Sequence, residues 1–90
     1  MAPSIKLSKH ARAFNTALGE RIKCEREWME EPRAFIATEL GISEVMVSNI
    51  ENGRNAPSVF HLEQICKLFS IDVDSMLYEA KESISTLVKT

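Results

Sequence analysis

The segment AFIATELGISEVMVSNIENG, residues 34–53, decides the fold of this chain. Apolar residues recur at helical spacing on both sides of Gly41, and glycine readily adopts the left-handed conformation that ends many helices. Ser43 then stands where a second helix begins, and Gly53 follows that helix as Gly41 follows the first. Two short helices joined by a tight turn that contains glycine form a helix-turn-helix unit.

The same signals, read outward from this segment, predict five helices. Ser8, Ser43, Ser58 and Asp72 each precede an apolar pattern with a helical period, so we expect them to be N-caps. Pro32 can occupy the first position of its helix, because the N–H that proline lacks would have no partner there. The expected helices cover approximately residues 9–26, 32–40, 44–52, 59–69 and 73–88.

Each expected helix carries an apolar stripe, and together the stripes predict one core. The inward-facing residues include Phe14, Leu18, Ile22, Ile36, Leu40, Val47, Ile50, Leu62, Ile65, Cys66, Phe69 and Met76. Gly19 lies inside the first helix, where glycine costs about 1 kcal/mol relative to alanine. We therefore expect Gly19 to mark the close approach of a neighbouring helix.

The composition is that of one globular, all-helical domain. Of the 90 residues, 44% are hydrophobic and 27% are charged, with only 3 Gly and 3 Pro, as in folded proteins of this size. The chain has neither a run of about 18 apolar residues nor an apolar block after Met1, which predicts a cytoplasmic protein. Cys24 and Cys66 are too few for a disulfide framework and are expected to be thiols.

The distribution of charge is more informative than its sum. A net charge of -2 argues against a nonspecific nucleic-acid binder, because neutralising phosphates requires clustered Lys and Arg. Basic residues predominate in residues 1–26 and acidic residues in residues 55–90, so the two ends of the chain differ in sign. Any DNA binding should therefore depend on a local surface of the protein.

Sequence motifs in a fixed order connect the chain to a known family. They are Leu18-Gly-Glu-Arg-Ile22, Arg26, Ile36-Ala37, Leu40-Gly-Ile-Ser43, Val47-Ser-Asn-Ile-Glu-Asn-Gly53, Pro57 and Leu68-Phe-Ser-Ile-Asp-Val73. In these motifs the chain resembles the Xre and phage-repressor family, which includes Cro-like and lambda-repressor-like helix-turn-helix proteins. The resemblance implies a single all-α domain over residues 1–90, a compact five-helix lambda-repressor-like fold. Its core would cover about 14–77, with residues 78–90 as a C-terminal helical extension.

The resemblance also implies which residues meet DNA. The helix over 44–52 would enter the major groove and the helix over 32–40 would cross the backbone. The base-reading residues would be Glu44, Val45, Met46 and Asn49. The phosphate-contacting residues would be Arg33, Ser43, Ser48, Arg54 and Asn55.

Three departures from the family pattern change these expectations. The family commonly has Gln where this chain has Arg33, so we expect the phosphate contact to remain and the bracing of the recognition helix to differ. Glu44 and the apolar residues after it make an unusually acidic and apolar start to a recognition helix. This start favours either higher sequence specificity or the binding of a protein partner. Trp28 suggests that the loop before residue 32 packs around its indole ring, with Phe35 beside it, or that the two rings join Met29 in a protein-binding patch.

The last predicted helix has two interpretations. Its apolar stripe continues beyond what a five-helix core requires, so its outer half either folds back on the core or forms the seam of a homodimer. The seam residues would be Tyr78, Ile84, Leu87 and Val88.

The resulting prediction is a DNA-binding transcriptional regulator, a repressor that binds a palindromic operator as a homodimer. The alternative is a protein-interaction module on the same fold, either an antitoxin or an anti-repressor. His10 and His61 have no partners at metal-ligand spacing, and no nucleophile motif is present, so neither a metal, another cofactor nor enzymatic activity is expected.

Overall fold

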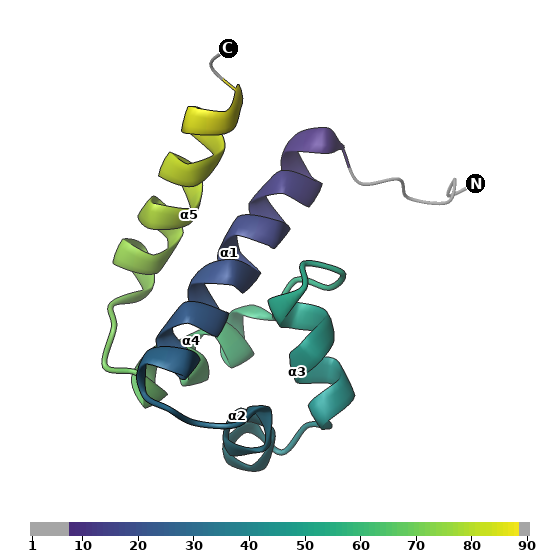
Figure 1. Ribbon diagram of the computed structural model, residues 1–90, viewed down its shortest axis with the longest axis vertical. Helices are drawn as coiled ribbons and strands as arrows, with labels where there is room; N and C mark the ends of the chain where they lie inside the picture. The colour runs from purple at the N-terminus through teal and green to yellow at the C-terminus, as the bar shows by residue number, and fades with distance from the viewer. Residues whose placement is uncertain (1–7, 89–90) are drawn as a thin grey trace, which may run out of the picture.

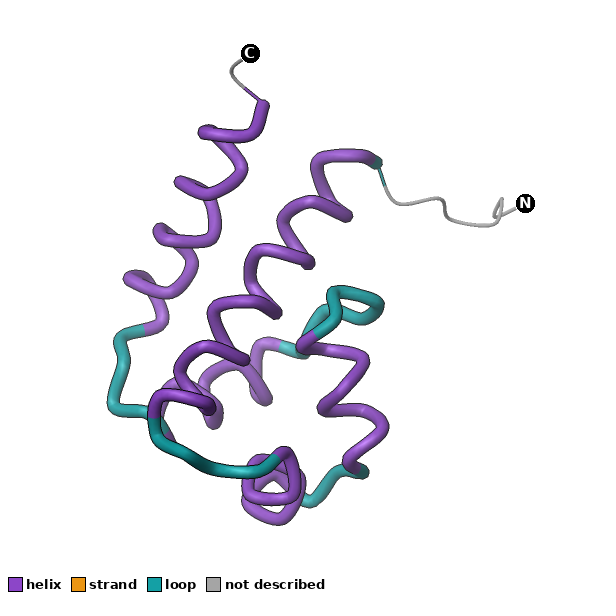
Figure 2. Tube along the Cα trace, in the orientation of Figure 1, coloured by secondary structure: helices purple, strands orange, loops and turns teal. Residues whose placement is uncertain are grey.

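The described part of the chain has an all-α fold of five helices, as the sequence predicts (Figure 1). The computed structural model describes residues 8–88, with side chains through residue 84. The helices are α1 (Lys9–Trp28), α2 (Arg33–Leu40), α3 (Glu44–Glu51), α4 (Val59–Leu68) and α5 (Val73–Val88). Between residues 8 and 88 only helices and loops occur (Figure 2). In that range no helix is both long and apolar enough to cross a membrane.

The helices begin where the sequence places their caps. Ser8, Ser43, Ser58 and Asp72 each accept a hydrogen bond from the backbone N–H three residues ahead, at 3.0–3.1 Å. Each cap of this kind contributes about 1 kcal/mol, because it satisfies an N–H that the helix leaves unpaired. The turn between α2 and α3 follows the prediction too, since Gly41 is left-handed at φ 70°.

Two predicted boundaries are wrong by one or two residues. Pro32 is the N-cap of α2 and not its first helical residue, because its ψ of 166° is extended. The first helix continues past Arg26 to Trp28, and it ends only where Glu30 adopts a φ of 58°. The remaining three helices start as expected and end within about one residue of the predicted positions.

The core lies where all five helices meet. Its buried hydrophobic residues are Leu18, Ile22, Ile36, Ala37, Val47, Ile50, Leu62, Ile65, Cys66, Phe69, Met76 and Ala80. Helix α5 runs antiparallel to α1 along its length, and α2, α3 and α4 gather around the C-terminal half of α1 (Figure 1). The helix-turn-helix unit therefore packs against the long helix α1, and α5 packs against another side of α1.

Gly19 sets the distance between α1 and α3. A Cβ atom at this position would lie 2.3 Å from the carbonyl oxygen of Ile50 and 2.6 Å from that of Glu51. The close approach expected at Gly19 is thus confirmed, and the neighbouring element is the end of α3. Any larger residue would push α3 away from α1.

The expected packing around Trp28 is wrong. The Trp28 side chain is 83% exposed, because α1 continues through this residue and carries the indole on its outer side. Phe35 packs instead against Phe69 of the core, with ring centroids 6.4 Å apart. Phe35 therefore belongs to the core margin and not to a patch with Trp28.

The first half of α5 folds back on the chain's own core. Met76 and Ala80 are fully buried, and Arg21 of α1 forms an ion pair with Glu79 at 2.7 Å. Of the predicted seam residues, Tyr78 is 63% exposed and Ile84 is half-buried. The side chains of the other two, Leu87 and Val88, lie outside the described residues. The seam itself therefore stays a prediction.

Candidate nucleic-acid interface

Helix α3 has one buried face and one exposed face. Val47, Ile50 and Glu51 are buried against the core, which fixes the helix in position. On the opposite face, the Val45 side chain is 70% exposed and that of Met46 is 41% exposed, next to the exposed Glu44. The first turn of α3 therefore presents side chains that a ligand can reach, on a helix that the core holds in place.

The predicted base-reading Asn49 is half-buried and already has a neighbour. Its side-chain oxygen accepts a hydrogen bond from Arg54 Nη1 at 3.4 Å. An amide oxygen has two lone pairs, so one acceptor position and both N–H donors of Asn49 remain for a base edge. Asn49 lies one turn beyond Val45, on the accessible side of the helix.

Three of the predicted phosphate-contacting residues lie at the two ends of α3. Ser43 caps the helix at its N-terminus, and its hydroxyl can still donate while it accepts the N–H of Met46. At the other end, Arg54 and Asn55 are exposed in the loop that follows. Ser48 is half-buried within the helix, where its hydroxyl accepts a hydrogen bond from Asn52 Nδ2 at 3.3 Å.

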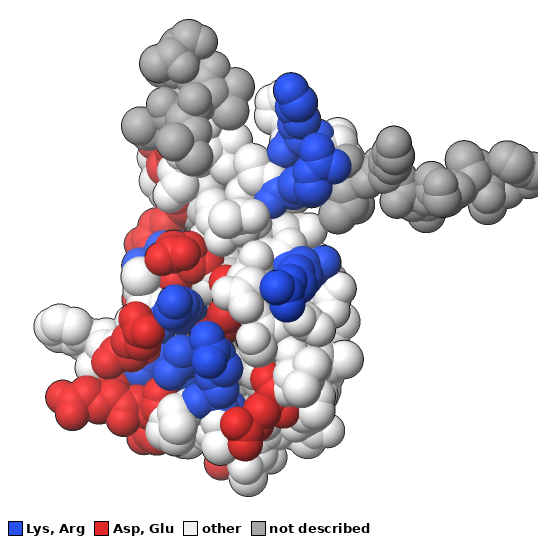
Figure 3. Space-filling view, turned by 45° about the vertical axis from the view of Figure 1, so that its right-hand side comes forward, with Lys and Arg blue, Asp and Glu red and all other residues white. Residues whose placement is uncertain are grey.

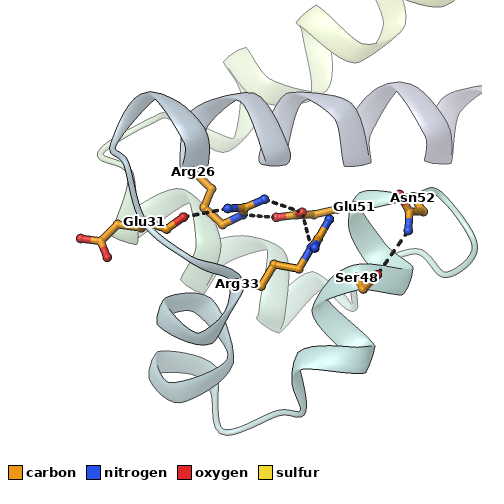
Figure 4. A network of polar contacts seen from close by, with 6 residues as sticks. All are labelled: Arg26, Glu31, Arg33, Ser48, Glu51 and Asn52. Carbon is orange, nitrogen blue, oxygen red and sulfur yellow. Dashed lines mark hydrogen bonds and ion pairs between the residues drawn. The ribbon is translucent and has the colours of Figure 1, made fainter.

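A buried carboxylate joins α3 to both α1 and α2 (Figure 4). Glu51, at the end of α3, accepts two hydrogen bonds from Arg26 of α1, from Nε at 2.7 Å and Nη2 at 3.0 Å. Its Oε1 also accepts Arg33 Nε of α2 at 3.0 Å. The remaining Arg26 nitrogen, Nη1, donates to the backbone oxygen of Glu31 at 2.7 Å. One carboxylate thus fixes three helices and the loop before α2.

The contact with Glu51 favours the charged form of Arg26. The hydrogen bond to Glu51 raises the pKa of Arg26, and this effect outweighs the opposing effect of burial. The Glu51 side chain is fully buried, so removing either partner would leave an uncompensated charge in the core. With two guanidinium groups on one carboxylate, the network carries one excess positive charge.

Arg33 carries that excess charge toward the surface. Its side chain is 38% exposed, and it uses Nε for the contact with Glu51. The terminal nitrogens Nη1 and Nη2 make no hydrogen bond within the described residues. They can therefore donate two parallel hydrogen bonds to a phosphate. Arg33 thus holds the recognition helix through an ion pair with Glu51 at the end of α3.

The sequence does not single out Glu51 as a bracing residue. Glu51 appears there only as part of the Glu-Asn-Gly motif, and Arg26 only as a family match. The two residues are 25 positions apart, so their pairing depends on tertiary structure. A signal was nevertheless present, because a Glu directly beside the apolar Ile50 at the end of an amphipathic helix needs a partner when it is buried.

On the face shown in Figure 3, the charged side chains lie in separate groups. Figure 3 shows Lys and Arg side chains in several separate clusters, with Asp and Glu gathered toward one side of the view. A face without a continuous basic patch binds DNA weakly unless side chains also contact the bases. This distribution agrees with the low net charge of the chain.

Helices α2 and α3, joined by the turn at Gly41, form a helix-turn-helix unit. Residues 33–75 match a family model described as Helix-turn-helix, which represents the Cro/C1-type proteins. The matched segment runs from the start of α2 into α5 and contains the whole helix-turn-helix unit. The resemblance to the Xre and phage-repressor family is thereby confirmed, and the family is one of DNA-binding regulators. A search of curated proteins found no match.

Proposed function

We propose that this protein is a sequence-specific transcriptional repressor that binds a palindromic operator as a homodimer. The observation that carries the proposal is the division of α3 into a buried face and an exposed first turn. An α-helix with its side chains is about 10–12 Å across, which suits the major groove, about 12 Å wide, and α3 presents its exposed face over eight residues. Occupying an operator that overlaps a promoter would block transcription.

The exposed residues of α3 supply chemistry for base recognition. Asn49 can pair with adenine, and Glu44 can accept a hydrogen bond from the amino group of cytosine. Val45 and Met46 can pack against a thymine methyl group. Each good polar pair contributes about 1–3 kcal/mol of discrimination, and Glu44 repels phosphates wherever it lacks its cytosine. The acidic and apolar start of α3 therefore favours specificity over general affinity.

The phosphate contacts would hold α3 in register. Arg33 at the start of α2 and Arg54 after α3 lie on either side of the recognition helix in sequence, and Ser43, Ser48 and Asn55 add neutral donors. The hydrogen bond from Arg33 to Glu51 supports this role, because it orients the guanidinium before DNA arrives.

Two copies are required for adequate specificity. One short helix contacts only a few base pairs, whereas two helices related by a two-fold axis can read half-sites about 34 Å apart on one face of the duplex. A homodimer of this kind recognises an inverted repeat, which explains the expectation of a palindromic operator.

Selection from a random duplex DNA library at about 150 mM salt tests this proposal, because sequence-independent binding is weak there. Retained sequences should contain an inverted repeat with half-site centres about one helical turn apart. Asn49→Ala and Arg54→Ala should abolish the enrichment, whereas Lys67→Ala, a charge removal on the exposed side of α4, should preserve it. A folded protein that enriches no sequence would contradict the proposal.

A protein-binding role on the same fold is the second candidate. The exposed Val45 and Met46 favour it, because apolar side chains at the start of α3 could also pack against a partner protein. An antitoxin or an anti-repressor would use this surface to mask a toxin or another regulator. A gene for a toxin-sized protein beside this one would support the antitoxin, and failure of the DNA selection would support either form.

A further inference from the structure

Among the described residues, the most exposed large hydrophobic side chain lies on the same helix as a pocket. Trp28, at the end of α1, is 83% exposed, and Met29 beside it is 48% exposed. Toward the other end of α1, a pocket of about 350 Å³ opens between α1 and α5, and apolar atoms form most of its wall. The pocket is lined by Ala13, Thr16, Ala17, Glu20, Arg21 and Ser83.

Trp28 and the pocket share one face of α1. Eleven residues separate Ala17 from Trp28, which is about three helical turns or about 16 Å along the axis. Trp28 therefore points in nearly the same direction as Ala17, and a single chain cannot bring its own Trp28 to its own pocket. A second copy that lies antiparallel on this face can exchange the two contacts, as a two-fold interface requires.

We propose that two copies of the chain pair through α1 in antiparallel orientation, so that each Trp28 occupies the pocket of the other copy. The two-fold axis would cross α1 between Arg21 and Cys24, midway between Trp28 and Ala17. The inference rests on the homodimer proposed above and replaces the predicted seam on the outer half of α5 with a surface formed by α1 and the near side of α5.

The charges at the two ends of α1 complement each other in this arrangement. Glu27, Glu30 and Glu31 surround the end that carries Trp28, and Lys9 and His10 lie at the opposite end. With Trp28 of one copy opposite Ala17 of the other, antiparallel pairing brings the acidic end of one copy to about two helical turns from the basic end of the other, twice in each dimer. Parallel pairing would instead oppose like charges, so the charge pattern selects the antiparallel orientation.

The pairing leaves the recognition helix accessible. Gly19, which contacts the end of α3, is nine residues from Trp28 and therefore lies on the opposite side of α1. The two α3 helices consequently occupy the outer sides of the dimer. Tryptophan is among the residues that contribute most to binding energy at protein interfaces, and pockets of about 300–1,000 Å³ are the usual size of binding sites.

The test follows the dimer without DNA, using the full chain. Trp28 is the only tryptophan, so its fluorescence reports directly on its own burial. The sedimentation coefficient and the Trp28 emission maximum should change with protein concentration at the same midpoint. The emission should shift to shorter wavelengths as the dimer forms. Trp28→Ala should raise the dimer Kd at least about 30-fold, as expected of an interface hot spot. Phe60→Ala removes an exposed aromatic ring elsewhere and should leave the dimer unchanged.

Charge reversal separates this interface from an unspecific apolar contact. Glu30→Lys should weaken the dimer most at low salt, and adding Lys9→Glu should recover part of the loss, because the attraction between the two ends acts across about two helical turns and is reversed in both copies together. Far-ultraviolet circular dichroism and urea unfolding should show that each variant keeps its fold. Species larger than a dimer would contradict the closed, two-fold arrangement.

Three results would overturn the α1 interface. The first is a protein that remains monomeric to about 1 mM, a concentration where interfaces worth only about 4 kcal/mol associate. The second is a dimer that forms without any change in Trp28 emission. The third is a dimer that survives Trp28→Ala but is lost in Ile84→Asp, which would place the seam on α5. In the last two cases, selection of an inverted repeat by the same protein would leave the proposed repressor function intact.

Discussion

At the scale of single residues, Glu51 is the side chain on which the position of α3 depends most. It is fully buried and accepts hydrogen bonds from Arg26 and Arg33, which belong to two other helices. Removing one partner of a buried ion pair typically costs about 3–5 kcal/mol, because the remaining charge loses its compensation. Glu51→Ala should therefore reduce the free energy of unfolding by about that amount in urea titrations.

The control for this prediction is Glu63→Ala. Glu63 is exposed on α4, and such a surface change should alter the stability by no more than about 0.5 kcal/mol. Equal effects of the two substitutions would show that the Glu51 network does not stabilise the fold.

The two cysteines should differ sharply in reactivity. Cys24 is exposed, whereas Cys66 is buried beside Met76, and burial, with a smaller effect from Asp72, raises the pKa of the Cys66 thiol above 9.0. Because the folded pKa is raised, the stability from keeping this thiol neutral is complete below pH 9 and declines as the pH rises further. A thiol reagent at pH 8 should modify one cysteine at once and the second only at the rate of unfolding. Rapid modification of both would contradict the buried position of Cys66.

At the scale of elements, the contact between α1 and α3 depends on the absence of a side chain at Gly19. In an ordinary helix, Gly→Ala adds about 1 kcal/mol of stability. Here the new Cβ would lie 2.3 Å from a backbone oxygen of α3, so Gly19→Ala should destabilise the protein. Gly41→Ala is the matched control, because Gly41 has open space around it and would suffer only from its φ of 70°. A smaller loss of thermal stability at position 19 than at position 41 would contradict the close packing of α1 and α3.

The coupling of α2 to α3 predicts different effects of two substitutions at Arg33. Arg33→Gln should reduce by about one the slope of the logarithm of the operator-binding constant against the logarithm of the salt concentration, because one phosphate contact is lost. Arg33→Lys should preserve the slope but still weaken operator binding, since lysine lacks the planar fork that contacts Glu51 and a phosphate together. Binding titrations from about 50 to 200 mM salt test both. A lysine variant that binds like the wild type would show that Glu51 does not orient Arg33 for DNA.

The elements could be predicted from the sequence because their signals are local. Ser43 and Gly41 act within one turn of the helix that each bounds, so their roles followed from residue type. The position of Trp28 could not be predicted in this way. Its exposure depends on α1 continuing two residues beyond the expected end, which turns the indole away from the loop. The Arg26–Glu51 pair joins distant positions, and only packing brings them together.

At the scale of the whole molecule, the DNA-binding unit and the proposed dimer surface lie on opposite sides of α1. On one side α1 supports the helix-turn-helix through Gly19, and on the other it carries Trp28 and the pocket shared with α5. A dimer formed on the second side leaves both recognition helices accessible. DNA binding and dimer formation should therefore reinforce each other, so operator DNA should lower the protein concentration at which Trp28 emission shifts.

Base reading by the exposed residues of α3 is tested most directly by binding to single-base variants of the selected operator. Wild type, Asn49→Ala and Glu44→Ala would be titrated against each variant at about 150 mM salt. Each substitution should remove about 1–3 kcal/mol of discrimination at one position in each half-site, symmetrically, and leave the other positions unchanged. A uniform loss of affinity at all positions, or no loss, would contradict base reading by α3.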